Sequence, residues 1–162
     1  ELFFFGSRSS ERSPEEKELF ALLDSVKVHA INPDNIQEHI RKKFVMISAT
    51  ATGTSYFNQT VGDALTDHPT EMRALIEELC SLFQSLGYDL GEDAVERTIE
   101  RQTFMIPTST SSMHVDFMAG HATELENLTG YVVRTARAHG LSLPTYEKMY
   151  EALASQPYPP AL

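Results

Sequence analysis

Apolar side chains recur at helical spacing over most of this chain. The clearest case lies between Pro69 and Gly87, where apolar residues fall three and four positions apart. This spacing places them on one face of a helix, and Gly is a common residue just past a helix end. The pattern therefore predicts one helix here, with an apolar face made of Met72, Leu75, Ile76, Leu79, Leu82, Phe83 and Leu86.

Other helices are predicted from the same spacing and from residues that start or stop helices. The run Ser13-Pro14-Glu15-Glu16 is typical of a helix start, because an N-cap residue precedes Pro and two acids. The remaining predicted helices run from about Ile36 into the small residues Ser48 to Ser55, from Gly91 to about Met105, from Ser112 to about Met118, from Thr123 to His139 and from Thr145 to Ala154.

Strand-like patterns occur only at the beginning of the chain. Leu2 to Phe5 is a short apolar run before the polar loop Gly6 to Arg12, and Val26 to Ile31 alternates as a half-exposed strand does. We therefore expect a mainly α fold, with a β-α-β element in residues 1–32, a helical domain in residues 33–155 and an irregular tail in residues 156–162. A chain that starts inside a strand and without Met also suggests a piece of a longer polypeptide.

Composition and charge exclude several classes of protein. The chain has 162 residues, of which 41% are hydrophobic and 22% charged, as in a globular domain. Thirteen Lys and Arg face 23 Asp and Glu, for a net charge of -10, which argues against nucleic-acid binding. No apolar run reaches the roughly 18 residues of a membrane helix. Cys80 is the only cysteine, which favours a buried, unreactive thiol and a cytoplasmic protein.

Lys43 is the first residue whose place in the pattern suggests chemistry. A lysine on an apolar stripe extends its amine to water, pairs with an acid or faces a cleft. The first outcome is the commonest, whereas in a cleft the ammonium can donate a proton to a substrate. The stripe in which Lys43 lies consists of Ile36, Ile40, Phe44, Ile47 and Ala51.

Ser112 and Glu124 each stand at a predicted helix start, where both have a structural explanation. Ser112 suits an N-cap, and Glu124 suits the first turn of a helix because an acid there complements the helix dipole. Metal binding is not expected, because His121 and Glu124 share a helix face only as a pair, and two ligands do not make a site. The chain also lacks the G-x-G-x-x-G and G-x-x-x-x-G-K-[ST] loops that bind phosphates.

Several motifs occur together in the second half of the chain. They are Ser111-Ser112-Met113-His114-Val115-Asp116, Thr123-Glu124-Leu125-Glu126, Gly130, and the helix end Ala136 to Pro144. Together they resemble the C-terminal signature of the ketopantoate reductase family. An earlier signature of that family, a Lys followed nineteen residues later by G-[DE]-x-L, matches Lys43 and Gly62-Asp63-Ala64-Leu65. The resemblance covers nearly the whole chain.

The resemblance implies a helical domain like that of 6-phosphogluconate dehydrogenase, which closes over an N-terminal Rossmann domain. In that family NADPH reduces the ketone of 2-dehydropantoate to pantoate, a step of pantothenate and coenzyme A synthesis. Matched residue by residue, Lys43 corresponds to the catalytic proton donor, Ser112 to a substrate-binding serine and Glu124 to an acid near the cofactor ribose and the lysine. The expected partners are a small 2-oxo acid and the Rossmann domain, which would hold most of the NADP. The isolated chain would then be inactive.

Three positions depart from the family pattern. Well-known members carry Asn where this chain has Ile47, Ala51 and Val61, and each lost hydrogen bond is worth about 0.5–1.5 kcal/mol. Nearby hydroxyls, those of Thr50, Thr52 and Ser55, are candidate replacements. Two alternatives stay open: a relative that reduces a different 2-oxo acid, and a non-catalytic helical module that assembles as a homodimer.

Overall fold

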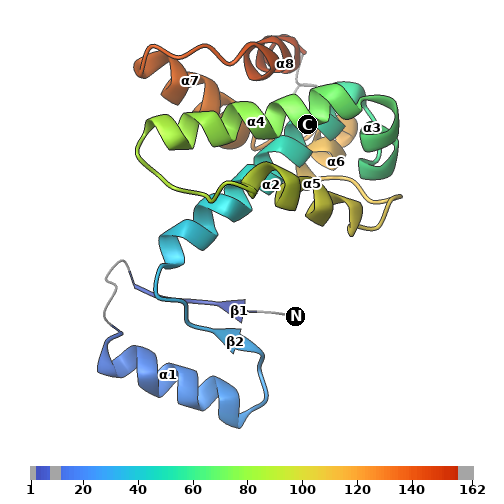
Figure 1. The fold of residues 1–162 in the computed structure, drawn as a ribbon. Coiled ribbons are helices and arrows are strands. Elements are labelled where there is room, and N and C mark those ends of the chain that lie inside the picture. Colours follow the sequence, from blue (N-terminus) through green and yellow to red (C-terminus); the bar gives the residue numbers. More distant parts are fainter. Residues whose placement is uncertain (1–2, 8–11, 157–162) are drawn as a thin grey trace. The chain divides into compact units, whose positions relative to one another are not determined.

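The computed structural model describes residues 3–7 and 12–156, and the chain divides into two compact units, Glu1–Arg41 and Lys42–Leu162. The described residues form eight α-helices, one π-helical turn and two short strands (Figure 1). The predicted mainly α fold class is therefore confirmed. Leu2, residues 8–11 of the predicted loop and residues 157–162 of the predicted tail lie outside the described residues.

The first unit contains the predicted β-α-β element. Strands β1 (Phe3–Phe4) and β2 (Ala30–Ile31) pair in parallel, and α1 (Pro14–Ser25) connects them. Ser13 caps α1, because its hydroxyl accepts from the Glu16 N–H at 3.3 Å and its own N–H donates to the Glu16 carboxylate at 2.9 Å. The assignment of residues 1–32 as a connection to a nucleotide-binding domain stays a prediction.

The second strand is shorter than the predicted Val26–Ile31. Val26 is the C-cap of α1, and its N–H still donates to the Leu22 carbonyl. Lys27 follows in a left-handed conformation, with φ 58°. The alternating pattern that predicted a longer strand thus includes the end of the helix and the turn that follows, whose backbone groups are already bonded.

Helix α2 (Ile36–Phe57) begins in the first unit, and its residues from Lys42 onward belong to the second unit. All residues from 48 to 55 are buried, and each of them is Ser, Thr, Ala or Gly. Their small size lets neighbouring helices approach closely: a Cβ at Gly53 would overlap the sulfur of Met72 on α4 (Pro69–Ser85). The hydroxyl of Thr54 donates to the Thr50 carbonyl at 2.8 Å, so this buried hydroxyl has a hydrogen-bond partner.

Helix α4 confirms the clearest sequence prediction. Six of the seven predicted apolar residues are fully buried, and the helix packs against α3 (Val61–Asp67), α5 (Ala94–Thr103) and α8 (Pro144–Ala154). Helix α3 was not predicted. Thr60 caps it by accepting from the Asp63 N–H at 3.2 Å. The segment that the family motif presents as a turn is therefore the start of a helix.

The last helices lie close to their predicted positions. Helix α6 (Ser112–Ala119) agrees with the prediction, and α5 is shorter than the predicted Gly91 to Met105. The predicted helix from Thr123 begins instead at a π-helical turn, η1 (Glu126–Gly130), which continues directly into α7 (Tyr131–Ala138).

Glu78 of α4 holds the start of α8. Its two carboxylate oxygens accept from the N–H groups of Thr145 at 2.8 Å and Tyr146 at 3.0 Å. This arrangement satisfies two backbone donors at a helix start and places a negative charge at the positive end of the helix dipole. Tyr146 is fully buried, and its hydroxyl hydrogen-bonds Ser48 of α2 at 3.0 Å.

We expect Glu78→Gln to lower the free energy of unfolding by about 1 kcal/mol, because the amide loses the charge and turns a donor toward the α8 N–H groups. Chemical denaturation followed by circular dichroism measures this change. The matched control is Glu77→Gln, whose carboxylate makes an exposed i,i+4 ion pair with Arg73 at 3.3 Å and should cost less than about 0.5 kcal/mol. Equal unfolding midpoints for the two variants would contradict the capping role.

Candidate functional site

Lys43 lies on the surface of α2, and its surroundings differ from the predicted stripe. Ile36 and Ala51 of the stripe are buried and Phe44 packs against the core, but Ile40 is 52% exposed and Ile47 is 37% exposed, so the stripe is only in part a core face. Val45 and Ala49, outside the stripe, occupy the core. The spacing of apolar residues did not identify the buried face of α2 fully, because the face that packs inward carries Ser and Thr as well as apolar residues. Among the described residues, none forms a hydrogen bond or ion pair with the Lys43 side chain.

A small buried cluster joins the three segments that carry the predicted site residues. It consists of Ala51, Met113, Leu125 and Leu153, all at most 3% exposed. Ala51 follows Lys43 by two turns of α2, Met113 follows Ser112, and Leu125 follows Glu124. Packing of Ala51, Met113 and Leu125 therefore brings these parts of the three segments together within the second unit, with Lys43 two turns away along α2. No described hydrogen bond links the three side chains to one another.

Two hydrogen bonds between hydroxyl groups fix the same arrangement. The Thr52 hydroxyl lies 2.7 Å from that of Thr129 in η1. The Thr54 hydroxyl lies 2.8 Å from that of Ser111, which precedes α6. Sequence reasoning missed both pairs, because a Thr at a helical position gives no sign of which distant residue it will meet.

Ser112 is the first residue of α6, and it is exposed. The N-cap is Ser111, whose hydroxyl accepts from the His114 N–H at 3.1 Å. The structural explanation of Ser112 as an N-cap is therefore wrong by one residue. Because Ser111 satisfies the helix end, the Ser112 hydroxyl is not used for capping.

A buried histidine fixes the start of α6. The two ring nitrogens of His114 lie 2.6 Å from the Thr110 hydroxyl and 2.8 Å from the Asn58 side-chain oxygen. Burial lowers the pKa of His114, because desolvation disfavours the charged imidazole. A neutral ring suits these partners, with one nitrogen accepting from Thr110 and the other donating to Asn58. Among the six histidines, no spacing in the sequence marks this one.

Glu124 is exposed in the segment just before η1, where its carbonyl accepts from the Asn127 and Leu128 N–H groups. The turn beside it is braced by Glu126. That carboxylate pairs with Arg134 and accepts from the Tyr150 hydroxyl at 2.7 Å, and the Tyr150 bond is the main cause of its lowered pKa. A Cβ at Gly130 would lie 2.7 Å from the Arg134 guanidinium and 2.9 Å from the Glu126 carboxylate, so a larger residue here would displace this ion pair.

The described residues hold neither a metal-ligand cluster nor a membrane-spanning helix. Nowhere in residues 3–7 and 12–156 do three or more His, Cys, Asp or Glu side chains group in a way that could hold a metal ion. Within the same ranges, every helix is too short or too polar to cross a membrane.

Comparison with known proteins assigns the family. The family model described as "Ketopantoate reductase PanE/ApbA C terminal" matches residues 35–156. The chain belongs to the ketopantoate reductase family.

Curated relatives and solved structures of this family are about twice as long as the chain. An uncharacterized oxidoreductase of Bacillus subtilis, YkpB, is 29% identical over 93% of this chain and 50% of its own length. The 2-dehydropantoate 2-reductase of Salmonella typhimurium is 28% identical over 73% of this chain and 39% of its own. The structure of 2-dehydropantoate 2-reductase from Porphyromonas gingivalis superposes with a TM-score of 0.79 and 38% identity, covering 95% of this chain and 47% of that one.

The three departures from the family's Asn pattern have different surroundings. Ala51 and Val61 are buried, at 3% and 1% exposure, whereas Ile47 reaches the surface. Of the candidate replacements, Thr50 is bonded to the Met46 carbonyl and to Gln102, and Thr52 to Thr129. The remaining candidate hydroxyl, that of Ser55, is fully enclosed and has no described partner.

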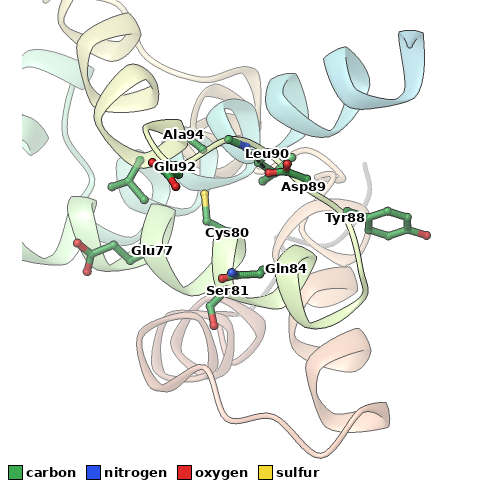
Figure 2. A pocket seen from close by; sticks show the side chains of 11 residues that line it. Glu77, Cys80, Ser81, Gln84, Tyr88, Asp89, Leu90, Glu92 and Ala94 are labelled. Carbon is green, nitrogen blue, oxygen red and sulfur yellow. Dashed lines mark hydrogen bonds between the residues drawn. The ribbon is translucent and has the colours of Figure 1, made fainter.

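A separate cavity of about 460 Å³ lies between α4 and the segment from Tyr88 to Val95 (Figure 2). None of the three predicted site residues lines it. The Cys80 thiol points into this cavity toward Leu90 and Ala94. Burial, with a smaller contribution from Glu77, raises the pKa of Cys80 from 9.0 to about 11. The thiol is therefore protonated at neutral pH, as expected for an unreactive cysteine, but Cys80 is half-buried and not fully buried as predicted.

The raised pKa makes the reactivity of Cys80 depend on pH in a specific way. Since only the thiolate reacts, modification by iodoacetamide at pH 7 should be about 100-fold slower than that of a thiol with an ordinary pKa. The rate should rise about tenfold per pH unit and level off only near pH 11. Mass spectrometry of the folded chain, with the urea-unfolded chain as reference, measures these rates. A plateau below pH 9 would show that burial does not control this thiol.

Proposed function

We propose that this chain is the C-terminal, substrate-side domain of an NADPH-dependent 2-oxo-acid reductase, with 2-dehydropantoate as the first substrate to test. The observation that carries the proposal is the Ala51–Met113–Leu125 cluster, which brings together the segments bearing Lys43, Ser112 and Glu124. Those three residues are identified from sequence resemblance alone, which is independent of the packing. The names of the relatives support the reaction, because most of them are 2-dehydropantoate 2-reductases.

The three side chains suit ketone reduction. Reduction of a ketone leaves negative charge on its oxygen, and the ammonium of Lys43 would both stabilise that charge and donate a proton to the oxygen. Glu124, a carboxylate, would orient the ammonium, and the Ser112 hydroxyl would donate to the substrate. The exposure of all three residues leaves them accessible to a ligand.

NADPH would supply the hydride when bound. The exposed Glu124 carboxylate, which pairs with no described side chain, fits an acceptor for ribose hydroxyls. The chain has no glycine-rich phosphate loop, so the phosphates and the adenine would be bound elsewhere in a longer protein.

The first unit supports an adjoining domain on the same polypeptide. Its two-stranded sheet is parallel, and parallel sheets are normally larger and covered on both faces. No residue of α1 is buried, and Leu22 and Val26 are 60% and 62% exposed. We propose that further strands of an N-terminal Rossmann domain complete this sheet and cover these apolar residues.

The test is the reaction itself. The full-length protein that contains this sequence should oxidise NADPH when 2-dehydropantoate is added, as followed by absorbance, and pantoate should accumulate in equal amount. A panel of other 2-oxo acids, compared by kcat/KM, identifies a different substrate if 2-dehydropantoate reacts poorly. No oxidation with any 2-oxo acid would refute the proposal.

A second candidate function is assembly, in which the domain joins two copies of the protein. The observation that favours it is the exposure of Phe104, at 80%, and of Ile106, at 70%, which is high for large apolar side chains. Light scattering at several concentrations distinguishes the candidates: a monomer at all of them would exclude assembly, while a dimer with no reductase activity would favour it.

A further inference from the structure

The surface of α2 that follows Lys43 begins with an exposed apolar side chain, which bears on the substrate. Ile47 lies one turn after Lys43, and residues four apart on a helix are neighbours on its surface. Its side chain is 37% exposed, and Ile40, nearly one turn before Lys43, is 52% exposed. His39, a full turn before Lys43, is also exposed, so a substrate whose ketone lies at Lys43 would meet hydrocarbon without a neighbouring polar side chain only on the Ile47 side of the ammonium.

The polar side chains farther along α2 are already used inside the fold. By helical spacing Thr50 and Thr54 follow on the same side as Lys43. Thr50 is bonded to the Met46 carbonyl and to Gln102, while Thr54 is bonded to the Thr50 carbonyl and to Ser111. The next polar side chain with exposure, Tyr56, lies 13 residues on, about 20 Å along the helix axis.

Two of the positions at which well-known family members carry Asn are buried in this chain, and they cannot supply the missing hydrogen bonds to a substrate. Ala51 and Val61 are apolar, and both are enclosed in the core. The Ser55 hydroxyl has no described partner, but it is enclosed as well and offers nothing to a ligand at the surface. Lys43 and Ser112 would serve the ketone and the carboxylate, which every 2-oxo acid has. A hydroxyl on a third group that lies toward Ile47 would find no available polar side chain on that part of α2.

From this arrangement, and resting on the proposed function, we infer that the preferred substrate is a 2-oxo acid whose third group is an unsubstituted hydrocarbon. Ile47 is the specificity-determining residue. It contacts that hydrocarbon and disfavours a hydroxyl, because a buried hydroxyl without a partner loses its hydrogen bonds to water.

A matched pair of substrates tests the inference. 2-Dehydropantoate and trimethylpyruvate have the same branched skeleton, except that a hydroxymethyl group in the first is a methyl group in the second. For the full-length protein with NADPH, kcat/KM should be about tenfold to a hundredfold higher for trimethylpyruvate. Calorimetric titration of the two hydroxy-acid products should show the same order of affinity, which gives a readout independent of turnover.

Two variants assign the preference to a residue. Ile47→Asn supplies an amide beside Lys43 and should shift the kcat/KM ratio about tenfold toward 2-dehydropantoate. Ile106→Asn makes the same change at an isoleucine that is 70% exposed outside α2, and it should leave the ratio unchanged. Circular dichroism verifies that both variants are folded.

The outcomes separate this inference from the function on which it rests. A preference of the wild type for 2-dehydropantoate, or a ratio that Ile47→Asn does not move, would overturn the inference and leave the reductase function standing. Failure to reduce any 2-oxo acid would overturn the proposed function and the inference together.

Discussion

Lys43→Ala in the full-length protein should lower kcat by about 10² to 10⁴, the usual contribution of a general acid. The variant would lack both the proton donor and the positive charge that stabilises the developing oxyanion, while exposed Lys43 contributes little to the core. Stopped-flow or steady-state absorbance of NADPH measures kcat, and the unfolding midpoint should stay within error of the wild type.

The control for this prediction is the neighbouring residue. Lys42→Ala removes the same charge from the same turn of α2, but its side chain points about 100° away around the helix. It should retain kcat within a factor of about three. If Lys43→Ala also keeps the wild-type kcat, the proton donor lies elsewhere.

The isolated chain should fold and yet show no turnover with any 2-oxo acid. Folding is expected because α4 and α7 bury apolar faces in one shared core. Loss of turnover is expected because the reaction needs the nicotinamide held near the ketone, and the chain contains no phosphate-binding loop to hold it. Lys43, Ser112 and Glu124 would remain in place on an open surface.

Calorimetry with NADPH and absorbance with added 2-dehydropantoate test both parts of this prediction. Heat from binding should be undetectable at micromolar cofactor, and absorbance should stay constant over hours. The positive control is the full-length protein under the same conditions. Micromolar affinity or measurable turnover by the isolated chain would reveal a nucleotide site within residues 1–162.

The features that the sequence predicted well are those with a local cause. The apolar face of α4 follows from spacing alone, and the capped start of α1 follows from Ser13 and the residues after it. The buried face of α2 did not follow, because its residues beyond Ser48 are small and polar and their burial depends on partners far away in the chain. Spacing instead favoured Ile40 and Ile47, which are exposed.

In the candidate site, too, some features could be predicted from the sequence, whereas others depend on contacts between distant parts of the chain. Lys43, Ser112 and Glu124 were chosen by resemblance, and nothing in the hydrophobic pattern would have distinguished Ser112 from Ser111 as the cap. That choice depends on which hydroxyl reaches the His114 N–H, a matter of backbone geometry. The brace formed by Glu126, Arg134 and Tyr150 was marked in the sequence only by Gly130, whose lack of a side chain makes room for it.

The buried hydroxyl pairs of α2 restrict the alignment of this helix, along its axis, with the helices around it. Apolar surfaces can slide past one another at little cost, whereas the Thr52–Thr129 and Thr54–Ser111 bonds are made in only one axial alignment of α2 with its neighbours. A slip of one helical turn, about 5.4 Å, would break both bonds and carry Lys43 by the same distance relative to Ser112. Two buried threonines thus fix the position of Lys43 along the helix axis, although neither of them contacts it.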